Sequence, residues 1–221
     1  MIRVNDICKT YGKKQVLKDI NLEAHPGEIV SIVGANGCGK TTLLQILSGV
    51  IAPDSGSINI FEKNALKEKK TFEKYVGFVP QDNPLLMDLS VKDNLDFFAC
   101  AVKEPDYSLL KDYDLEPLLS SKVSTLSGGM KRRLSIVCAM IGKHPILILD
   151  EPTSSLDMYY QESIMNSLID FKKKNGIIVY STHNPDEILK SDVCFLFDSG
   201  TLIRYNKNDI DVNQIRNKIK Q

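Results

Sequence analysis

The chain has 221 residues, of which 43% are hydrophobic and 25% are charged, as in an ordinary globular domain with a buried core. Its 28 Lys and Arg residues equal its 28 Asp and Glu residues, so no net charge attracts the chain to nucleic acid and no nucleic-acid partner is expected. Five cysteines without a CxxC pair argue against a disulfide framework and indicate a reducing cytosol.

The N-terminus lacks the apolar segment of a secretory signal. The apolar runs are far shorter than the roughly 20 residues that cross a bilayer. We therefore expect a chain that does not cross a membrane by itself, although it can lie beside a membrane that another protein crosses.

The first 80 residues predict strands around a glycine-rich loop. Alternating or β-branched apolar residues predict strands at residues 2–8, 18–24, 28–33, 57–61 and 75–80. The strand 28–33 enters the loop 34–41. Apolar side chains recur at helical spacing behind this loop, so we expect a helix that begins near Lys40.

The rest of the chain predicts helices first and then alternating strands and helices. Amphipathic helices are expected between residues 81 and 125, followed by a helix over 128–141. The series then continues with a strand, a helix, a strand, a helix and a strand at residues 146–149, 160–174, 177–180, 187–190 and 193–197. This alternation predicts an α/β core of mostly parallel buried strands, with the helical block inserted into it.

Three predicted strands end in polar groups that phosphate chemistry uses. One strand leads into Gly34, a second ends at Asp150 and Glu151, and a third is followed by residues 181–183. Because ligands bind outside the carboxyl ends of strands in open α/β sheets, the three ends are expected to meet at one site.

The loop 34–41 has the sequence GANGCGKT. Its glycines let backbone N–H groups surround an oxyanion, Lys40 supplies a cation to the β- and γ-phosphates, and Thr41 offers a hydroxyl to Mg²⁺. The alternative is a glycine-rich turn with a chance lysine. The strand before the loop and the helix after it favour phosphate binding.

Asp150 and Glu151 suit the two acidic roles of phosphate hydrolysis. Asp150 follows a buried strand and can meet Mg²⁺ directly or through water, whereas Glu151 can take a proton from an attacking water. The alternative is that both acids are solvated groups at a strand end.

A second glycine-rich turn opens the helix predicted at 128–141. Ser127 can cap this helix, and Gly128 and Gly129 leave backbone donors open. Because Met130 is neither Glu nor Gln, no capping box occupies these donors and they are free for an external anion. The alternative is an ordinary capped helix.

These motifs, in this order, resemble the nucleotide-binding ATPase subunit of an ABC transporter over about residues 2–203. Residues 34–42 match the Walker A loop, 146–151 the Walker B strand and 126–130 the family's signature. The resemblance implies that ATP is bound by residues of the first loop and by those of the signature turn: Gly34, Ala35, Asn36, Gly37, Cys38, Gly39, Lys40, Thr41, Thr42, Ser127, Gly128 and Gly129.

The resemblance also assigns roles to isolated residues. Gln81 matches the glutamine that contacts Mg²⁺ and relays motion to the membrane partner, and Asp157 belongs to the D-loop 154–157. His183 matches the switch histidine that holds the γ-phosphate. Tyr11 matches the aromatic residue that stacks on adenine, with Val16 near the sugar and base. Without the resemblance, Tyr11 would be a packing or surface aromatic.

The implied cofactors are ATP and Mg²⁺. The metal ligands are Thr41, Gln81 and Asp150, and the catalytic residues are Lys40, Glu151 and His183.

The implied fold is a P-loop NTPase core, a RecA-like parallel sheet with helices. An antiparallel N-terminal β subdomain and an inserted α-helical subdomain complete it. The whole chain, 1–221, forms one domain, with the insertion at about 82–140 and the ATP-binding core at about 1–81 and 141–221.

The implied function is transport. Two such domains, identical or different, close head-to-tail around two ATPs and drive separate integral-membrane permease subunits from the cytoplasmic face of the membrane. The segment 126–134 favours export. One alternative is a soluble ABC ATPase without a membrane partner, for example in iron–sulfur assembly. A non-hydrolysing nucleotide-binding module is another, but it conflicts with the presence of Glu151 and His183.

Two features have alternative interpretations. The Cys38 thiol either reacts readily, because a helix start and Lys40 lower its pKa, or points into the protein. The apolar residues Leu85, Leu86, Met87 and Leu89 either form core or line a groove that receives a cytoplasmic helix of the membrane partner.

Overall fold

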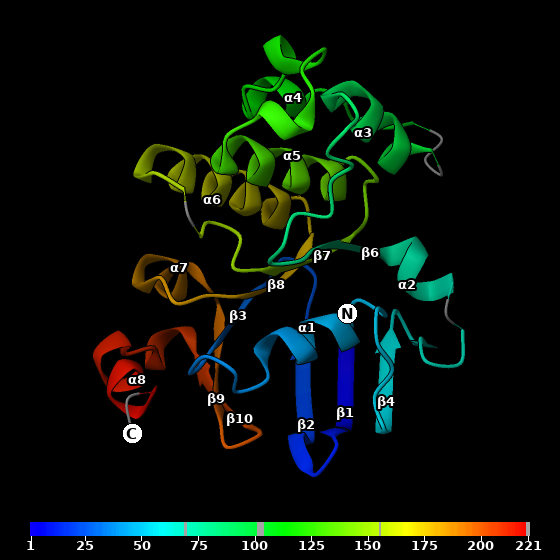
Figure 1. The fold of residues 1–221 in the computed structure, drawn as a ribbon. Coiled ribbons are helices and arrows are strands. Elements are labelled where there is room, and N and C mark those ends of the chain that lie inside the picture. The colour runs from blue at the N-terminus through cyan, green and yellow to red at the C-terminus, as the bar shows by residue number, and fades with distance from the viewer. Residues whose placement is uncertain (69, 101–103, 155, 220–221) are drawn as a thin grey trace.

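The computed structural model describes residues 1–68, 70–100, 104–154 and 156–219. They form two sheets with helices between and around them (Figure 1). The smaller sheet is antiparallel, has the order β2-β1-β4-β5 and comprises β1 (Ile2–Tyr11), β2 (Lys14–Ala24), β4 (Ser55–Ile60) and β5 (Lys63–Asn64).

The larger sheet has the order β10-β9-β3-β8-β7-β6. Its strands pair in parallel except β9 with β10, which are antiparallel. They are β3 (Ile29–Val33), β6 (Val76–Val79), β7 (Ile146–Asp150), β8 (Ile177–Ser181), β9 (Val193–Asp198) and β10 (Thr201–Asn206).

The helices are α1 (Lys40–Leu47), α2 (Lys70–Tyr75), α3 (Val91–Ala99), α4 (Leu109–Asp112), α5 (Gly128–Met140), α6 (Met158–Lys173), α7 (Pro185–Lys190) and α8 (Val212–Ile219). Short 3₁₀ turns lie at residues 116–118, 123–125 and 207–209. Within the described ranges, no helix combines the length and the apolar character that a membrane span requires.

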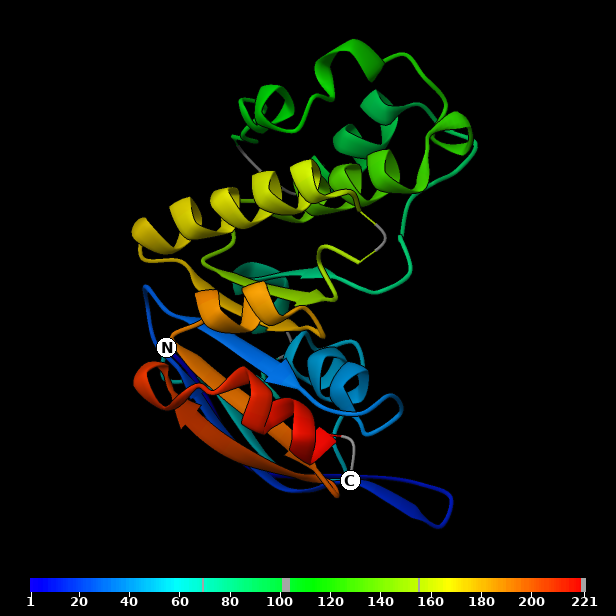
Figure 2. The same cartoon turned by 90° about the vertical axis from the view of Figure 1, so that its left-hand side faces the viewer.

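Alternation along the central strands explains the layers. In β7, Ile146 and Ile148 pack with α1 and the antiparallel sheet, whereas Leu147 and Leu149 pack with α5 and α6. Successive side chains of a strand point to opposite faces, so an unbroken apolar run is buried on both sides. Figure 2 shows α5 and α6 side by side over one face of this sheet.

The helices α3, α4 and α5 share one hydrophobic cluster with α6 and the upper face of the sheet. A third cluster lies under α7 and α8 and includes Val33, Leu196 and Ile215. The α/β architecture with a parallel sheet, an antiparallel N-terminal sheet and a helical layer confirms the predicted fold class.

Candidate functional site

The carboxyl ends of the three predicted strands lie next to one another. β3 and β7 each pair in parallel with β8, and Ser181 of β8 lies opposite both Ile32 and Asp150. The loop after β3, the acids that end β7 and the residues after β8 therefore share one edge of the sheet, as the sequence predicts.

Glycines shape the loop after β3. Gly37 and Gly39 have φ values of 72° and 126°, in the range that disfavours other residues. A Cβ on Gly39 would lie 2.8 Å from Val16 Cγ1 and 2.9 Å from Phe197 Cζ. Only glycine therefore lets the chain pass so close to these side chains and enter α1.

Lys40 begins α1 and is buried, with 6% of the residue exposed. Its ammonium donates to the carbonyl oxygens of Gly34 at 2.8 Å and Ala35 at 3.0 Å. No described carboxylate forms an ion pair with it, and the first turn of α1 holds no acid. A buried cation at a helix N-terminus, held only by carbonyl groups, suits a phosphate.

The Cys38 sulfur lies on the protein side of the loop. A Cβ on Gly34 would lie 3.0 Å from Cys38 Sγ, and the half-buried Cys38 packs on the same hydrophobic cluster as Val16. Of the two interpretations of Cys38, this orientation favours the one in which the sulfur points into the protein.

Asp150 is 1% exposed at the end of β7. Its Oδ1 accepts a hydrogen bond from Ser181 Oγ, while its buried Oδ2 has no partner among the described residues. An unpaired buried carboxylate oxygen fits a divalent cation or a water of its shell. Thr41 is exposed at the start of α1, and Gln81 is exposed after β6, so both have oxygens to offer there.

Glu151 has a left-handed backbone with φ of 50°. Its N–H donates to Ser181 O at 3.2 Å and Ser181 Oγ at 3.0 Å, which holds this unusual conformation. For a residue other than glycine such a backbone is sparsely populated, and it persists at sites where the surroundings enforce it. The Glu151 carboxylate lies beside His183.

His183 Nε2 lies 3.4 Å from Glu151 Oε1. Burial and the nearby Lys40 charge lower the pKa of His183, against the opposing effect of Glu151 and Asp150. The imidazole is therefore neutral at pH 7, with one ring nitrogen that donates and one that accepts. A pocket of about 170 Å³ lies beside His183 and Glu151, and its other lining residues are Thr153, Ser154, Gln161, Thr182, Asn184 and Glu187.

The second glycine-rich turn opens α5 as expected. Ser127 caps the helix, and its Oγ accepts from the N–H of Met130 at 3.2 Å. The expectation that all donors stay free is therefore wrong for Met130, because a serine cap reaches the N3 amide without a capping box. A Cβ on Gly128 would meet nothing within 4 Å, so this part of the turn is open.

The remaining predicted residues lie around this edge or beyond it. Tyr11 is half exposed in the β1–β2 hairpin, and Val16 contacts the loop at Gly39. Asp157 caps α6 by accepting from Tyr160 N at 3.1 Å. Ser155, also of the D-loop, lies outside the described residues.

The apolar segment after Gln81 divides into two parts. Leu85 is 7% exposed and belongs to the core cluster, whereas Leu86, Met87 and Leu89 are 37%, 42% and 42% exposed. The core interpretation therefore holds for Leu85 alone.

Two buried charged residues at the site were not singled out from the sequence. Arg132 of α5 donates to backbone carbonyls at the ends of β6 and β7. Glu187 of α7 is 2% exposed and accepts from Thr153 Oγ1, and burial raises its pKa. A charged residue at a core-facing position of a helix is the signal that could have found both.

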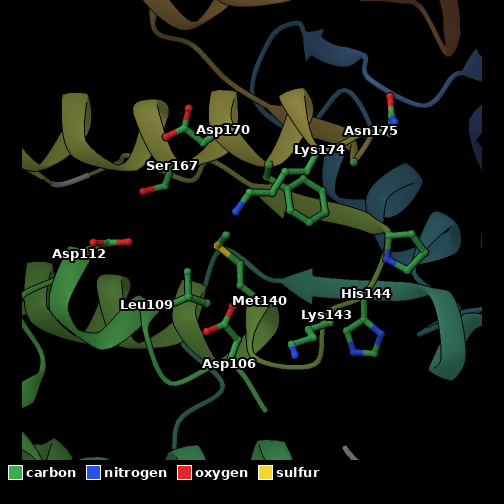
Figure 3. A pocket seen from close by; sticks show the side chains of 13 residues that line it. Asp106, Leu109, Asp112, Met140, Lys143, His144, Ser167, Asp170, Lys174 and Asn175 are labelled. Carbon is green, nitrogen blue, oxygen red and sulfur yellow. The ribbon is translucent and has the colours of Figure 1, made fainter. Parts of the chain in front are cut away.

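A larger pocket of about 460 Å³ lies elsewhere, between α4, α5 and α6 (Figure 3). Its lining combines acids such as Asp106 and Asp170 with bases such as Lys143 and Lys174. None of the predicted site residues is among the described residues that line it.

Comparisons with known proteins agree with this geometry. The ABC transporter family model matches residues 17–154. The Nod factor export ATP-binding protein I of Rhizobium etli is 33% identical over 84% of this chain and 61% of its own length. The spermidine/putrescine import ATP-binding protein PotA of Fusobacterium nucleatum is 34% identical over 92% of this chain and 56% of its own length.

Other relatives are longer still. ABC transporter G family member 20 of Dictyostelium discoideum is 32% identical over 91% of this chain, which spans 29% of that protein. Among solved structures, a dimeric ATP-binding cassette in a post-hydrolysis state, bound to ADP and Pi, matches with a TM-score of 0.85 and 26% identity over 94% of this chain and 99% of its own. This chain belongs to the ABC transporter family, as an ATP-binding and ATP-hydrolysing domain.

Proposed function

We propose that this domain binds ATP with Mg²⁺, closes head-to-tail with a second such domain around two ATPs, and drives separate membrane-spanning subunits. The observation that carries the proposal is the meeting of Lys40, Asp150, Glu151 and His183 at one edge of the sheet, beside a pocket.

The residues at this edge have distinct tasks. Lys40 compensates charge on the β- and γ-phosphates, together with the loop from Gly34 to Thr42. Thr41, Gln81 and Asp150 would hold Mg²⁺, which would neutralise charge on the phosphate oxygens. Glu151 takes the proton of the attacking water, and neutral His183 donates a hydrogen bond to the γ-phosphate.

The signature turn serves the partner's nucleotide. Among the described residues, no hydrogen bond or ion pair joins Ser127, Gly128 or Gly129 to the loop 34–41. An open helix start without a ligand in its own chain suits a phosphate held by another chain. The dimeric form of the cassette bound to ADP and Pi supports the same arrangement.

We propose that residues from about 82 to 140 form the inserted helical subdomain. The segments before and after it, about 1–81 and 141–221, then form the ATP-binding core. Three exposed apolar residues, Leu86, Met87 and Leu89, follow Gln81 at the start of the insertion. They suit contact with a cytoplasmic helix of the membrane partner, which supports the proposal that the domain lies on the cytoplasmic face of the membrane.

Export is the favoured direction. The segment 126–134 and the likeness to the Nod factor export protein support it, while the likeness to PotA supports import. A soluble ATPase without a membrane partner is the second candidate. Copurification with a polytopic membrane protein, after expression from the native gene cluster, separates the two.

The variant Glu151→Gln tests the site itself. Its amide keeps the shape of the carboxylate but accepts no proton, so ATP binds while turnover falls by about 10²- to 10⁴-fold. The ATP-loaded dimer then persists, which size-exclusion chromatography with MgATP detects. Lys40→Ala is the control, because it loses tight ATP binding and forms no dimer. Wild-type turnover in Glu151→Gln, or a monomer with MgATP, contradicts the proposal.

A further inference from the structure

Arg132 is a buried cation that forms no ion pair with an acid of the described ranges. It lies in the second turn of α5 and is 3% exposed. Its guanidinium donates to Pro152 O through Nε at 3.1 Å, to Pro80 O at 2.5 Å and Gln81 O at 3.4 Å through Nη1, and to Asp150 O at 2.5 Å and Glu151 O at 3.0 Å through Nη2.

All of these acceptors are backbone carbonyls, and no ion pair of Arg132 occurs among the described residues. A guanidinium offers five N–H donors in a fixed planar fork, so a single side chain can hold several carbonyls in a fixed relation. Burial lowers the pKa of Arg132 to about 10, against the opposing fields of Asp150 and Glu151, so it remains charged at pH 7.

Three of the five carbonyls that Arg132 holds belong to residues with a proposed role in the chemistry, namely Gln81, Asp150 and Glu151. On one side is the end of β6, where Gln81 begins its loop. On the other are Asp150 and Glu151 at the end of β7. Ser181 holds the N–H of Glu151 and Arg132 holds its carbonyl, so the left-handed residue is fastened at both of its peptide groups.

We propose that Arg132 is a positioning residue that fixes the Glu151 carboxylate for water activation and couples the signature helix to the hydrolysis site of the same chain. The inference rests on the proposed function, since α5 begins with the turn that is assigned to the partner's ATP. A movement of that turn would reach Glu151 through Arg132.

The neighbouring Arg133 provides a matched control. It is also in α5 and 2% exposed, but it donates to Tyr113 O and stacks on Tyr160 with its Cζ 3.9 Å from the ring centroid. Its Nη1 also lies 3.6 Å from Asp114 Oδ2. Among the described residues, the contacts of Arg133 lie within the helical layer, and none is to the carbonyls that Arg132 holds. Loss of Arg133 therefore measures what a buried arginine contributes to folding alone.

The test compares Arg132→Lys and Arg132→Met with Arg133→Lys and Arg133→Met by steady-state ATPase kinetics and thermal melting. Arg132→Lys keeps the charge but not the fork. We expect kcat to fall by about 10- to 100-fold with KM nearly unchanged, because the nucleotide loop is intact while Glu151 is misplaced. The Arg133 variants lower Tm without this fall in kcat.

A double variant separates positioning from stability. If Arg132 acts through Glu151, then Arg132→Lys lowers the residual turnover of Glu151→Gln little further. If Arg132→Met does not fold, Arg132→Lys alone decides. A kcat for Arg132→Lys equal to that of Arg133→Lys, or additive losses in the double variant, overturns the inference. Failure of Glu151→Gln and Lys40→Ala to behave as proposed would instead overturn the proposed function.

Discussion

Cys38 lies in the middle of the phosphate loop, yet its sulfur packs against Gly34 and the hydrophobic cluster beneath it. The direction of one side chain decides whether a cysteine in this loop is a reactive group or a small packing residue. Position 38 therefore requires a small side chain that fits beside Gly34, and it does not require a thiol.

A thiol reagent tests this at the residue scale. We expect a maleimide to modify the exposed Cys100 before Cys38, because burial shields the sulfur of Cys38 and raises the pKa values of Cys138 and Cys194. Cys38→Ala should keep ATPase activity. Peptide mass spectrometry identifies the first modified site, and dominant labelling of Cys38 that MgATP suppresses would contradict the expectation.

The sequence predicts those site residues that follow apolar strands, because a strand end has a fixed place in a parallel sheet. Lys40, Asp150, Glu151 and His183 were found in this way. Arg132 was not, because its acceptors Pro80 and Asp150 lie 52 and 18 residues away and only the folded chain brings them together. Because these acceptors are backbone carbonyls, which every residue has, the side-chain types in the sequence do not reveal them.

At the scale of elements, buried strands were predicted more fully than exposed ones. The strands β3, β7 and β8 are buried on both faces, so their residues are apolar except for the buried Ser31 within β3 and for Asp150 and Ser181, which end β7 and β8. β10 is an edge strand with no fully buried residue, and α8 buries only Ile215. The sequence of β10 shows no regular alternation of apolar and polar residues, so it carries little strand signal. In α8, by contrast, Val212, Ile215 and Ile219 recur at helical spacing, so this helix could have been predicted from the sequence.

The loop between β6 and α3 allows an element-scale prediction. Leu85→Glu should unfold the isolated domain, because it places a charge in the core, whereas Met87→Glu should leave folding and basal ATPase activity unchanged. If this segment receives the membrane partner, Met87→Glu also uncouples transport in the reconstituted complex. Circular dichroism melts, ATPase assays and transport assays give the three results. If Met87→Glu instead unfolds the isolated domain, Met87 belongs to the core.

At the scale of the whole molecule, the two glycine-rich turns belong to the same chain, yet no hydrogen bond or ion pair joins them among the described residues. A dimer solves this if each chain gives its loop to one ATP and its signature turn to the other. Ser127→Arg should then abolish hydrolysis while the dilute monomer keeps its nucleotide affinity, as measured by fluorescence titration. An equal loss of affinity in the monomer would place the turn at its own chain's nucleotide.

The separation of the two turns has a genetic consequence. Lys40→Ala damages the ATP site to which a chain contributes its loop 34–41, whereas Ser127→Arg damages the ATP site to which the chain contributes its signature turn. In a mixed dimer of the two variants, both lesions fall on one site and the other is assembled from undamaged parts. Two inactive preparations should therefore complement each other when mixed with MgATP, to at most about one half of wild-type turnover, because one of the two independent sites of each mixed dimer is intact. Whether a variant chain supports hydrolysis then depends on which chain it pairs with.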